Sequence, residues 1–231
     1  RREMQVVFQD PNSSLDPRMK VRDIIAEPLS SQTRLSDQDL ESSVAAALQK
    51  ARLEENFMWR YPHEFSGGQR QRVSIAAGLA LQPDFIVADE PVSMLDVSIR
   101  TEILQLMMDL RKSRGLTYLF ITHDLSLAWI LADRIAVMYL GKIVEKADRR
   151  ILFREVKHPY TRALFTAIPT IDVALQKAAT KLKGDVPSPM SPPPGCRFHP
   201  RCPHRMDVCS ATTPALLAQA IKIHFAHQFS N

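Results

Sequence analysis

The sequence predicts an α/β fold in which a parallel sheet carries helices on its faces. Short apolar runs of strand length recur along the chain, and stretches with helical spacing of apolar residues lie between them. The pattern changes after about His158, since seven of the sixteen prolines fall between Pro187 and Pro203. We therefore expect an α/β domain over residues 1–157 and a proline- and cysteine-rich extension over residues 158–231.

The expected strands are apolar runs of five or six residues. The first, MQVVF, is closed by the turn-rich stretch QDPNSSLDP, and the second, FIVAD, ends in a carboxylate. TYLFIT and RIAVMY complete the set. The four runs are residues 4–8, 85–89, 117–122 and 134–139.

The expected helices show apolar residues at helical spacing and recognisable ends. One begins with a capping-box-like pair, Ser36 and Asp39, and another stops at Gly115. A third opens just after the pair of glycines in FSGGQRQR, and the last covers DLSLAWILA. The four stretches are residues 36–53, 68–82, 98–115 and 124–132.

Composition favours an ordinary globular chain that is not built to bind nucleic acid. The net charge of +5 comes from 30 basic and 25 acidic residues that are interspersed, and the nearest basic cluster is the short RQR at Arg70 to Arg72. No apolar run approaches the roughly 18 residues of a membrane span. The N-terminal RREMQVVF has no signal-peptide core and no initial methionine, and it runs almost directly into a strand. We therefore expect that an upstream portion is missing.

An acidic pair, Asp89 and Glu90, follows the strand FIVAD. Ligands of α/β sheets bind beyond the carboxyl ends of the strands, which is where this pair would lie. One carboxylate can hold Mg²⁺ while its neighbour orients or deprotonates an attacking water. The alternative is a plain turn or helix cap.

Two further polar residues follow neighbouring strands. His123 ends the stretch FITHD, and Gln9 ends VVFQDP. Parallel strands deliver their carboxyl ends to the same edge of a sheet, so we expect Gln9, His123 and the acidic pair to meet there. A histidine at such a position can also be purely structural.

Ser66, Gly67, Gly68 and Gln69 stand immediately before a helix. Glycines allow a close backbone approach to an anion, and a helix N-terminus offers unpaired N–H groups and a positive dipole end. The usual phosphate cradle, G-x-x-x-x-G-K-[ST], occurs nowhere in the 231 residues. The stretch is therefore a candidate anion site, and the alternative is a simple helix-entry turn.

Together these motifs resemble the ATP-binding cassette (ABC) ATPases, in that family's fixed order. VVFQDP is similar to the glutamine loop, FSGGQRQR to the signature motif, FIVADEP to the Walker B strand, SMLD to the aspartate loop and ITHD to the histidine loop. The resemblance implies a P-loop NTPase-like core over residues 1–157, with an inserted helical subdomain at roughly residues 20–80. It also implies ATP and Mg²⁺ as cofactors.

The resemblance implies roles at two nucleotides. At the chain's own nucleotide it makes Asp89 the magnesium ligand, Glu90 the catalytic base, His123 the γ-phosphate contact and Gln9 the water and Mg²⁺ contact. In this family two subunits pair head to tail, and the signature motif of one contacts the ATP held on the other. The residues implied to serve that partner are Ser66, Gly67, Gly68 and Gln69, with Asp96 reaching across the interface.

The chain departs from the family pattern at its start. The family's Walker A loop and adenine-stacking aromatic lie upstream of the glutamine loop, together with strands from the middle of the sheet, and here only eight residues precede Gln9. We therefore expect the chain alone to bind little ATP and to sustain no hydrolysis. Met94 and Ala77, where the family usually has alanine and commonly arginine, remove no catalytic group.

Further stretches indicate the branch of the family. DNA-repair and chromosome-structuring ATPases insert a coiled coil before the signature, whereas 56 residues separate Gln9 from Ser66 here. RYPHEFSGGQRQR, EPVSMLDVSI, HPYTRAL and GDVPSPMSPPPGCRFHPRCP resemble the oligopeptide and dipeptide importer ATPases with their C-terminal extension; nickel and glutathione importers share that extension. The implied partners are a second ATPase subunit, two transmembrane permeases and an extracytoplasmic peptide-binding protein. The implied location is the cytoplasmic face of the inner or plasma membrane.

Three cysteines, Cys196, Cys202 and Cys209, lie in the extension as C-x₅-C-x₆-C. In this subfamily a fourth cysteine usually follows and the set can ligate an iron–sulfur cluster, whereas here only His224 and His227 follow. Three cysteines with a histidine could instead hold zinc. Unmetallated thiols fixed among prolines are the remaining interpretation.

Two other functions compete with a peptide-importing ATPase. The chain can be a non-hydrolysing subunit or gene remnant that only completes a partner's ATP site, and a G-x-x-x-x-G-K-[ST] upstream of Arg1 would exclude this. It can also be a metal- or nucleic-acid-binding regulator built on the cysteines, which retention on immobilised DNA would support.

Overall fold

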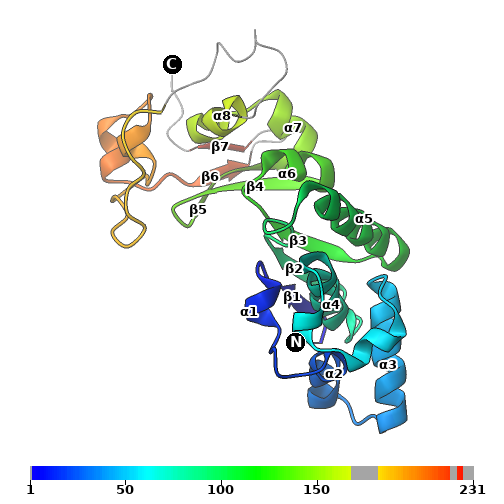
Figure 1. Cartoon of the computed structure of the whole chain (residues 1–231). Coiled ribbons are helices and arrows are strands. Elements are labelled where there is room, and N and C mark those ends of the chain that lie inside the picture. The colour runs from blue at the N-terminus through cyan, green and yellow to red at the C-terminus, as the bar shows by residue number, and fades with distance from the viewer. Residues whose placement is uncertain (1, 168–181, 219–222, 226–231) are drawn as a thin grey trace. The chain divides into compact units, whose positions relative to one another are not determined.

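The computed structural model describes residues 2–167, 182–218 and 223–225 (Figure 1). The chain divides into two compact units, Arg1–His123 and Asp124–Asn231, and each is described by itself. Among the described residues, none of the helices combines the length and the apolar character that a membrane crossing requires. The boundary that composition suggests, between residues 157 and 158, stays a prediction about domains.

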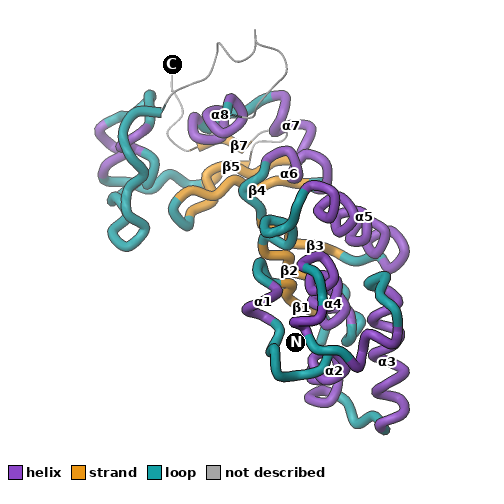
Figure 2. The backbone as a smooth tube through the Cα atoms, in the orientation of Figure 1, coloured by secondary structure: helices purple, strands orange, loops and turns teal. Residues whose placement is uncertain are grey.

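The first unit is built on three parallel strands, β1 (Met4–Val7), β2 (Phe85–Asp89) and β3 (Thr117–Ile121), in the order β1-β2-β3 (Figure 2). Val7 lies opposite Ala88, and Asp89 lies opposite Ile121. Three of the four expected strands and their parallel pairing are therefore confirmed. The register brings the carboxyl ends of all three strands to one edge.

One face of this sheet is covered by α4 (Gly67–Leu79). Val7, Ile86 and Ala88 are buried, and a methyl group added at Gly78 of α4 would lie 3.4 Å from the Val7 side chain. The other face carries four apolar side chains that are 39–53% exposed: Met4, Val6, Leu119 and Ile121. The expected parallel sheet with packed helices is therefore confirmed, and in the described residues this second face is the more exposed one.

The remaining helices of the first unit are α1 (Pro11–Ser14), α2 (Val21–Gln32), α3 (Asp37–Lys50) and α5 (Val97–Arg114), with 3₁₀ turns at Glu55–Trp59 and Pro62–Glu64. The apolar faces of α2 and α3 meet α4 in one core, in which the most buried side chains include Val21, Ile25, Val44, Leu48 and Val73. This core holds α2, α3 and the start of α4 together.

The helix ends follow from local chemistry. Ser36 caps α3 by accepting from the Asp39 N–H at 3.2 Å, as the sequence predicts. Gly115 ends α5 in the left-handed conformation (φ +67°), which a glycine adopts without a steric penalty. The helix α2 is missing from the sequence prediction.

In the second unit, α6 (Leu125–Leu131) leads into a hairpin of β4 (Arg134–Tyr139) and β5 (Lys142–Asp148). The two strands pair antiparallel and form their own sheet, so the expectation that residues 134–139 join a parallel sheet is wrong. The cause is the two-residue turn, where Leu140 and Gly141 both have positive φ (+44° and +77°). Such a turn reverses the chain directly and leaves no room for a crossover helix.

Beyond the hairpin come α7 (Arg149–Arg154) and α8 (Pro159–Thr166), 3₁₀ turns at His199–Arg201 and Asp207–Ser210, and the short antiparallel pair β6 (Leu216–Ala218) and β7 (Ile223–Phe225). Phe198 is 1% exposed and packs edge-on against Tyr139, at a ring-centroid distance of 5.2 Å. The proline-rich segment is thus fixed to the hairpin by an aromatic core.

A buried polar pair anchors the start of α8. The Glu145 carboxylate accepts the backbone N–H groups of Lys157 and His158 at 2.8 and 3.0 Å. The His158 ring is the N-cap of α8, where Nδ1 accepts the Tyr160 N–H at 3.1 Å. Burial lowers the pKa of His158 to about 4, so the folded protein holds this ring in its neutral form.

We predict that stability falls as the pH drops from about 6.5 towards 4. The unfolded chain protonates His158 near its ordinary pKa of about 6.5, whereas the folded chain resists until about 4. The stabilisation is therefore present above pH 6.5 and is lost through this window, up to roughly 3 kcal/mol.

Urea unfolding of the 231-residue chain at several pH values measures this loss. His158→Asn keeps a side-chain cap without a titrating ring, so its free energy of unfolding should depend less on pH. Parallel pH profiles for the native chain and the variant would contradict the prediction.

Candidate functional site

Three side chains from three strand ends meet at the edge of the sheet. Gln9 Nε2 donates to Glu90 Oε2 at 3.1 Å, and His123 Nδ1 lies 3.1 Å from the same oxygen. Gln9 follows β1, Glu90 follows β2 and His123 follows β3. The sequence therefore correctly predicts that Gln9, Glu90 and His123 lie together at this edge.

The site is accessible on one side. The His123 side chain is 74% exposed, whereas Glu90 is only 24% exposed. Because Glu90 Oε2 already has two partners, Oε1 is the oxygen left for a further proton donor such as a water molecule. An imidazole whose Nδ1 faces Glu90 directs Nε2 away from that carboxylate.

The backbone of Glu90 adopts a conformation that is uncommon for a residue other than glycine. Its φ of +43° lies in the left-handed region. Three hydrogen bonds hold it there: its N–H donates to the Ile121 carbonyl at 3.0 Å, and its carbonyl accepts from the Ser93 N–H at 3.1 Å and the Ser93 hydroxyl at 3.0 Å. Left-handed non-glycine residues persist only where the surroundings enforce them, and they cluster at functional sites.

Ser93 is a site residue that sequence reasoning missed. Besides fixing the Glu90 carbonyl, its Oγ lies 3.5 Å from Gln9 Nε2. It therefore links the turn after β2 to the residue after β1. Serine commonly bonds to a carbonyl three residues back, and this local preference was the available signal.

Asp89, the last residue of β2, is half-buried, and within the described ranges its carboxylate has no hydrogen bond or ion pair. A carboxylate and a glutamine amide oxygen are both oxygen donors of the kind that Mg²⁺ prefers, and Asp89 and Gln9 lie at the ends of neighbouring strands. In the described part of the chain, no three His, Cys, Asp or Glu side chains form a metal-holding group. Mg²⁺ usually takes one or two carboxylates and fills its shell with phosphate oxygens and water, so these residues fit Mg²⁺ delivered with a nucleotide.

Ser66 and Gln69 form a reciprocal cap at the start of α4. Ser66 Oγ accepts the Gln69 N–H at 3.3 Å, and Gln69 Oε1 accepts the Ser66 N–H at 3.0 Å. The N–H groups of Gly67 and Gly68 have no acceptor among the described residues, as is usual in a first helical turn. These two donors lie at the N-terminus of a 13-residue helix, the kind of position at which anions bind.

The two glycines differ in their surroundings. Gly67 is exposed, and a Cβ there would lie 3.8 Å from Leu95. Gly68 is buried, and a Cβ there would lie 2.4 Å from Cγ2 of Ile99 on α5, which is closer than real Cβ contacts. Gly68 is therefore required for packing α4 against α5, and Gly67 is the exposed member of the pair; that both glycines serve an approaching anion stays a prediction.

Asp96 is the N-cap of α5 and accepts the Ile99 N–H at 3.0 Å. Because Ile99 touches Gly68, the first turns of α4 and α5 lie side by side. Asp96 is exposed. The implied interface residues therefore form one continuous surface, and no hydrogen bond joins them to Gln9, Glu90 or His123 within the described residues.

The RQR cluster is used inside the molecule. Arg70 donates to the Pro62 carbonyl at 2.8 Å and to the Asn12 side chain, and so ties the start of α4 to the segment after Gln9. Arg72 is 12% exposed and pairs with Glu102 of α5 at 2.9 Å. These contacts span 58 and 30 residues of sequence and use both arginines within the first unit.

The three cysteines of the second unit are free thiols. Burial is the main cause that raises the pKa of Cys196 and Cys202, and the neighbouring cysteines add to it. In the described residues no three His, Cys, Asp or Glu side chains are arranged to hold one metal ion, and ligation of an iron–sulfur cluster or zinc by the cysteines stays a prediction. His227 lies outside the described residues, and the side chain of His224 is not described.

Two segments match known families. Residues 1–93 match the family described as "ABC transporter", and residues 144–209 match "Oligopeptide/dipeptide transporter, C-terminal region". The chain is 48% identical over 216 residues to the dipeptide transport ATP-binding proteins DppF of Haemophilus influenzae and Escherichia coli, covering 94% of itself and 66% and 65% of them. A putative peptide import ATP-binding protein of Brucella ovis is also 48% identical, with 94% of this chain and 68% of that protein covered. The chain thus spans about two thirds of the length of these relatives.

Solved structures show the same core. The chain superposes on cbiO1 from Clostridium perfringens, part of the ABC transporter complex cbiONQ, with a TM-score of 0.59 and 27% identity over 67% of this chain and 60% of that one. It also superposes on the ATP-binding cassette MJ0796 in a dimeric post-hydrolysis state bound to ADP and Pi, with a TM-score of 0.57 and 33% identity over 65% of each chain.

Substituting the two glycines separately tests the packing role of Gly68. Gly68→Ala places a methyl group against Ile99 Cγ2 and should destabilise the chain by about 1–3 kcal/mol, whereas Gly67→Ala has open space and should not. Urea unfolding gives both values.

Ile99→Ala in the Gly68→Ala background should recover part of the loss, because it removes the clashing methyl group. Equal stability of the two single variants would refute the packing role.

Proposed function

Because the chain belongs to the family of ABC transporter ATP-binding proteins, we propose that it acts as the ATP-hydrolysing, energy-coupling subunit of an importer for dipeptides or oligopeptides. The observation that carries the proposal is the Glu90 carboxylate at the end of β2, gripped by Gln9 and His123. Nucleotide-dependent phosphoryl transfer needs a positioned base beside Mg²⁺. At this edge Glu90 is the candidate base and Asp89 the candidate magnesium ligand.

Glu90 is proposed as the catalytic base. Gln9 and His123 bind Oε2 and fix the carboxylate in one orientation, which leaves Oε1 to accept a proton from the attacking water. The enforced left-handed backbone holds this orientation before any ligand arrives. Bound ATP with Mg²⁺ supplies the phosphoryl group and the positive charge that stabilises its transfer.

His123 is proposed to contact the γ-phosphate through Nε2. While Nδ1 donates to Glu90, Nε2 carries a proton only if the ring is charged. A hydrogen bond from His123 to a phosphate oxygen therefore requires an imidazolium ring or release of Glu90. Asp89 is proposed to hold Mg²⁺, with Gln9 contributing its amide oxygen.

Ser66, Gly67, Gly68 and Gln69, with Asp96, are proposed to serve the nucleotide of a second ATPase subunit in a head-to-tail dimer. Support comes from their separation from the Glu90 cluster in the hydrogen-bond network and from the free N–H groups of Gly67 and Gly68. A cassette of similar fold is dimeric in its ADP- and Pi-bound state.

The transport role follows from the relatives. Proteins named for dipeptide transport and peptide import share 48% of the sequence, and the extension matches the oligopeptide/dipeptide family over residues 144–209. We propose that the subunit works peripherally at the cytoplasmic face of the membrane with two permeases and an extracytoplasmic peptide-binding protein. Peptides are favoured over nickel or glutathione by the names of these relatives, and an iron–sulfur cluster is not part of the proposal.

The proposal about Glu90 predicts the outcome of a conservative substitution. In a chimera that places the segment preceding the glutamine loop of Escherichia coli DppF before Arg1, Glu90→Gln should leave ATP binding intact. It should slow turnover by at least about 10²-fold, the scale of general-base catalysis. Binding and phosphate release measure the two effects.

Matched variants give this experiment its controls. Asp89→Asn should weaken Mg²⁺-dependent nucleotide binding, and Glu54→Gln, at an exposed position outside the site, should change neither property. Hydrolysis by Glu90→Gln at near the native rate would remove the proposed role. A native chimera that binds ATP but never hydrolyses it would favour the alternative of a non-hydrolysing subunit.

The head-to-tail arrangement predicts that damage at Gly67 appears in the other subunit's site. Gly67→Asp adds a carboxylate to the exposed first turn of α4; two like charges about 4 Å apart repel by roughly 1 kcal/mol in bulk water and more in an interface. The measurement is ATP photo-crosslinked to each subunit of the assembled pair. Labelling of the unmutated partner should decrease, and labelling of the mutated subunit should not change.

Gly67→Ala is the control, since it adds bulk without charge and meets no neighbour closer than 3.8 Å. Gly67 is chosen for this test because a substitution at the buried Gly68 would also disturb the packing of α5. Labelling lost from the mutated subunit alone would mean that the stretch works on its own nucleotide.

A further inference from the structure

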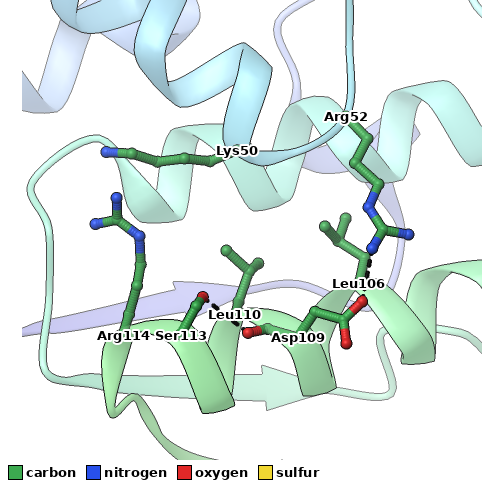
Figure 3. A pocket seen from close by; sticks show the side chains of 7 residues that line it. All are labelled: Lys50, Arg52, Leu106, Asp109, Leu110, Ser113 and Arg114. Carbon is green, nitrogen blue, oxygen red and sulfur yellow. Dashed lines mark hydrogen bonds and ion pairs between the residues drawn. The ribbon is translucent and has the colours of Figure 1, made fainter.

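A pocket of about 560 Å³ lies in the first unit between the C-terminal ends of α3 and α5 (Figure 3). It is distinct from the Glu90 cluster and from the surface around Gly67, and none of its lining residues belongs to either. Its floor is formed by the buried side chains of Leu106 and Leu110 from α5. The volume is in the range of sites for small organic ligands.

Two cations stand at one end of the pocket. Figure 3 shows the side chains of Lys50, the last residue of α3, and Arg114, the last residue of α5, pointing towards one another. Neither forms an ion pair or side-chain hydrogen bond within the described ranges, and burial, followed by the Arg114 charge, lowers the pKa of Lys50. Lys50 is half-buried and Arg114 is exposed, so solvent screens part of their repulsion, and an anion between them would remove the remainder.

At the opposite end of the pocket the charged side chains are paired with one another. Arg52 pairs with Asp109 at 2.6 Å, and Asp109 also accepts from Gln105 at 2.8 Å. Asp109 therefore does not serve as the counter-ion of Lys50 and Arg114. The pocket therefore has two cations at one end, an apolar floor, and an ion pair without net charge at the other end.

The partial charges of the two helix C-termini determine which ligand charge suits the cationic end of the pocket. The C-terminus of each helix carries about −0.5 elementary charge, so two ends offset roughly one of the two positive charges. The remaining charge of about +1 matches a monoanion better than a phosphate dianion. The apolar floor favours a ligand in which an apolar group is attached to that anion.

We propose that this pocket binds a small organic monocarboxylate, with its carboxylate between Lys50 and Arg114 and its apolar group on Leu106 and Leu110. The guanidinium of Arg114 offers a planar fork that suits a carboxylate, and Lys50 adds a point charge. A ligand bound there would contact both α3 and the C-terminal end of α5, the helix whose N-cap is Asp96. The proposal does not depend on ATP hydrolysis or on transport by the chain.

The probe is N-acetyl-leucine, and N-acetyl-leucine amide is its uncharged match. NMR methyl shifts of Leu106 and Leu110 in the 231-residue chain report the site directly. The acid should shift them saturably with a millimolar dissociation constant, and the amide should not. Raising the salt concentration to roughly 0.5 M should weaken the acid's binding several-fold, because the contact is electrostatic.

Lys50→Gln and Arg114→Gln should each weaken binding by about tenfold, the scale of losing one charged hydrogen bond. Lys112→Gln removes a charge from an exposed position of the same helix outside the pocket and should have no effect. Equal losses in all three variants, or equal shifts by acid and amide, would overturn the proposal. Inorganic phosphate at pH 8 that binds more tightly than N-acetyl-leucine would overturn the assignment of a monocarboxylate. The salt series on the native chain keeps the test decisive if a variant fails to fold.

Discussion

The candidate site depends on one carboxylate oxygen, Glu90 Oε2, which holds together the ends of three parallel strands. Gln9 and His123 reach it from either side because the register of β1, β2 and β3 brings their carboxyl ends to one edge. The backbone of Glu90 must turn through the left-handed region to present this oxygen, and Ser93 and Ile121 fix that turn. The position of the Glu90 carboxylate therefore requires a strained backbone conformation, which the hydrogen bonds from neighbouring residues maintain.

A second constraint joins the site to the helical part of the first unit. Gly68 lets α4 approach Ile99 of α5, and Arg70 ties α4 to Asn12, three residues after Gln9. The surface that begins at Ser66 and the edge that begins at Gln9 thus share α4 as a common support. Nucleotide contacts on these two surfaces would be mechanically linked through that helix.

The sequence predicts those features that arise from local chemistry or from simple sheet geometry. Ser36 and Gly115 mark helix ends because caps act within a few residues, and Gln9, Glu90 and His123 meet because parallel strands share an edge. The helix α2 was missed although its apolar residues have helical spacing, because Pro28 lies inside it and argues against a helix. The antiparallel partner of β4 was missed because β5 is rich in charge and depends on the turn at Leu140.

Contacts over long sequence separation could not be predicted from one sequence. The packing of Gly68 on Ile99, the bond from Arg70 to Asn12 and the pocket between α3 and α5 each join segments that pattern reasoning treats separately. A glycine pair before a helix looks the same whether a glycine faces an anion or a neighbouring isoleucine. Only the packed structure separates the exposed Gly67 from the buried Gly68.

The extension illustrates the same limit for cysteine patterns. The spacing of Cys196, Cys202 and Cys209 suggests a metal framework, yet within the described residues the segment is held by other forces. Phe198 is buried in an aromatic core with Tyr139 and Tyr160, and Cys196 bonds through its backbone N–H to the Cys209 carbonyl at 2.9 Å. Burial that fixes the segment also raises the pKa of Cys196 and Cys202. Hydrophobic burial and backbone hydrogen bonds between distant residues therefore order this segment, and cysteine spacing alone predicts neither.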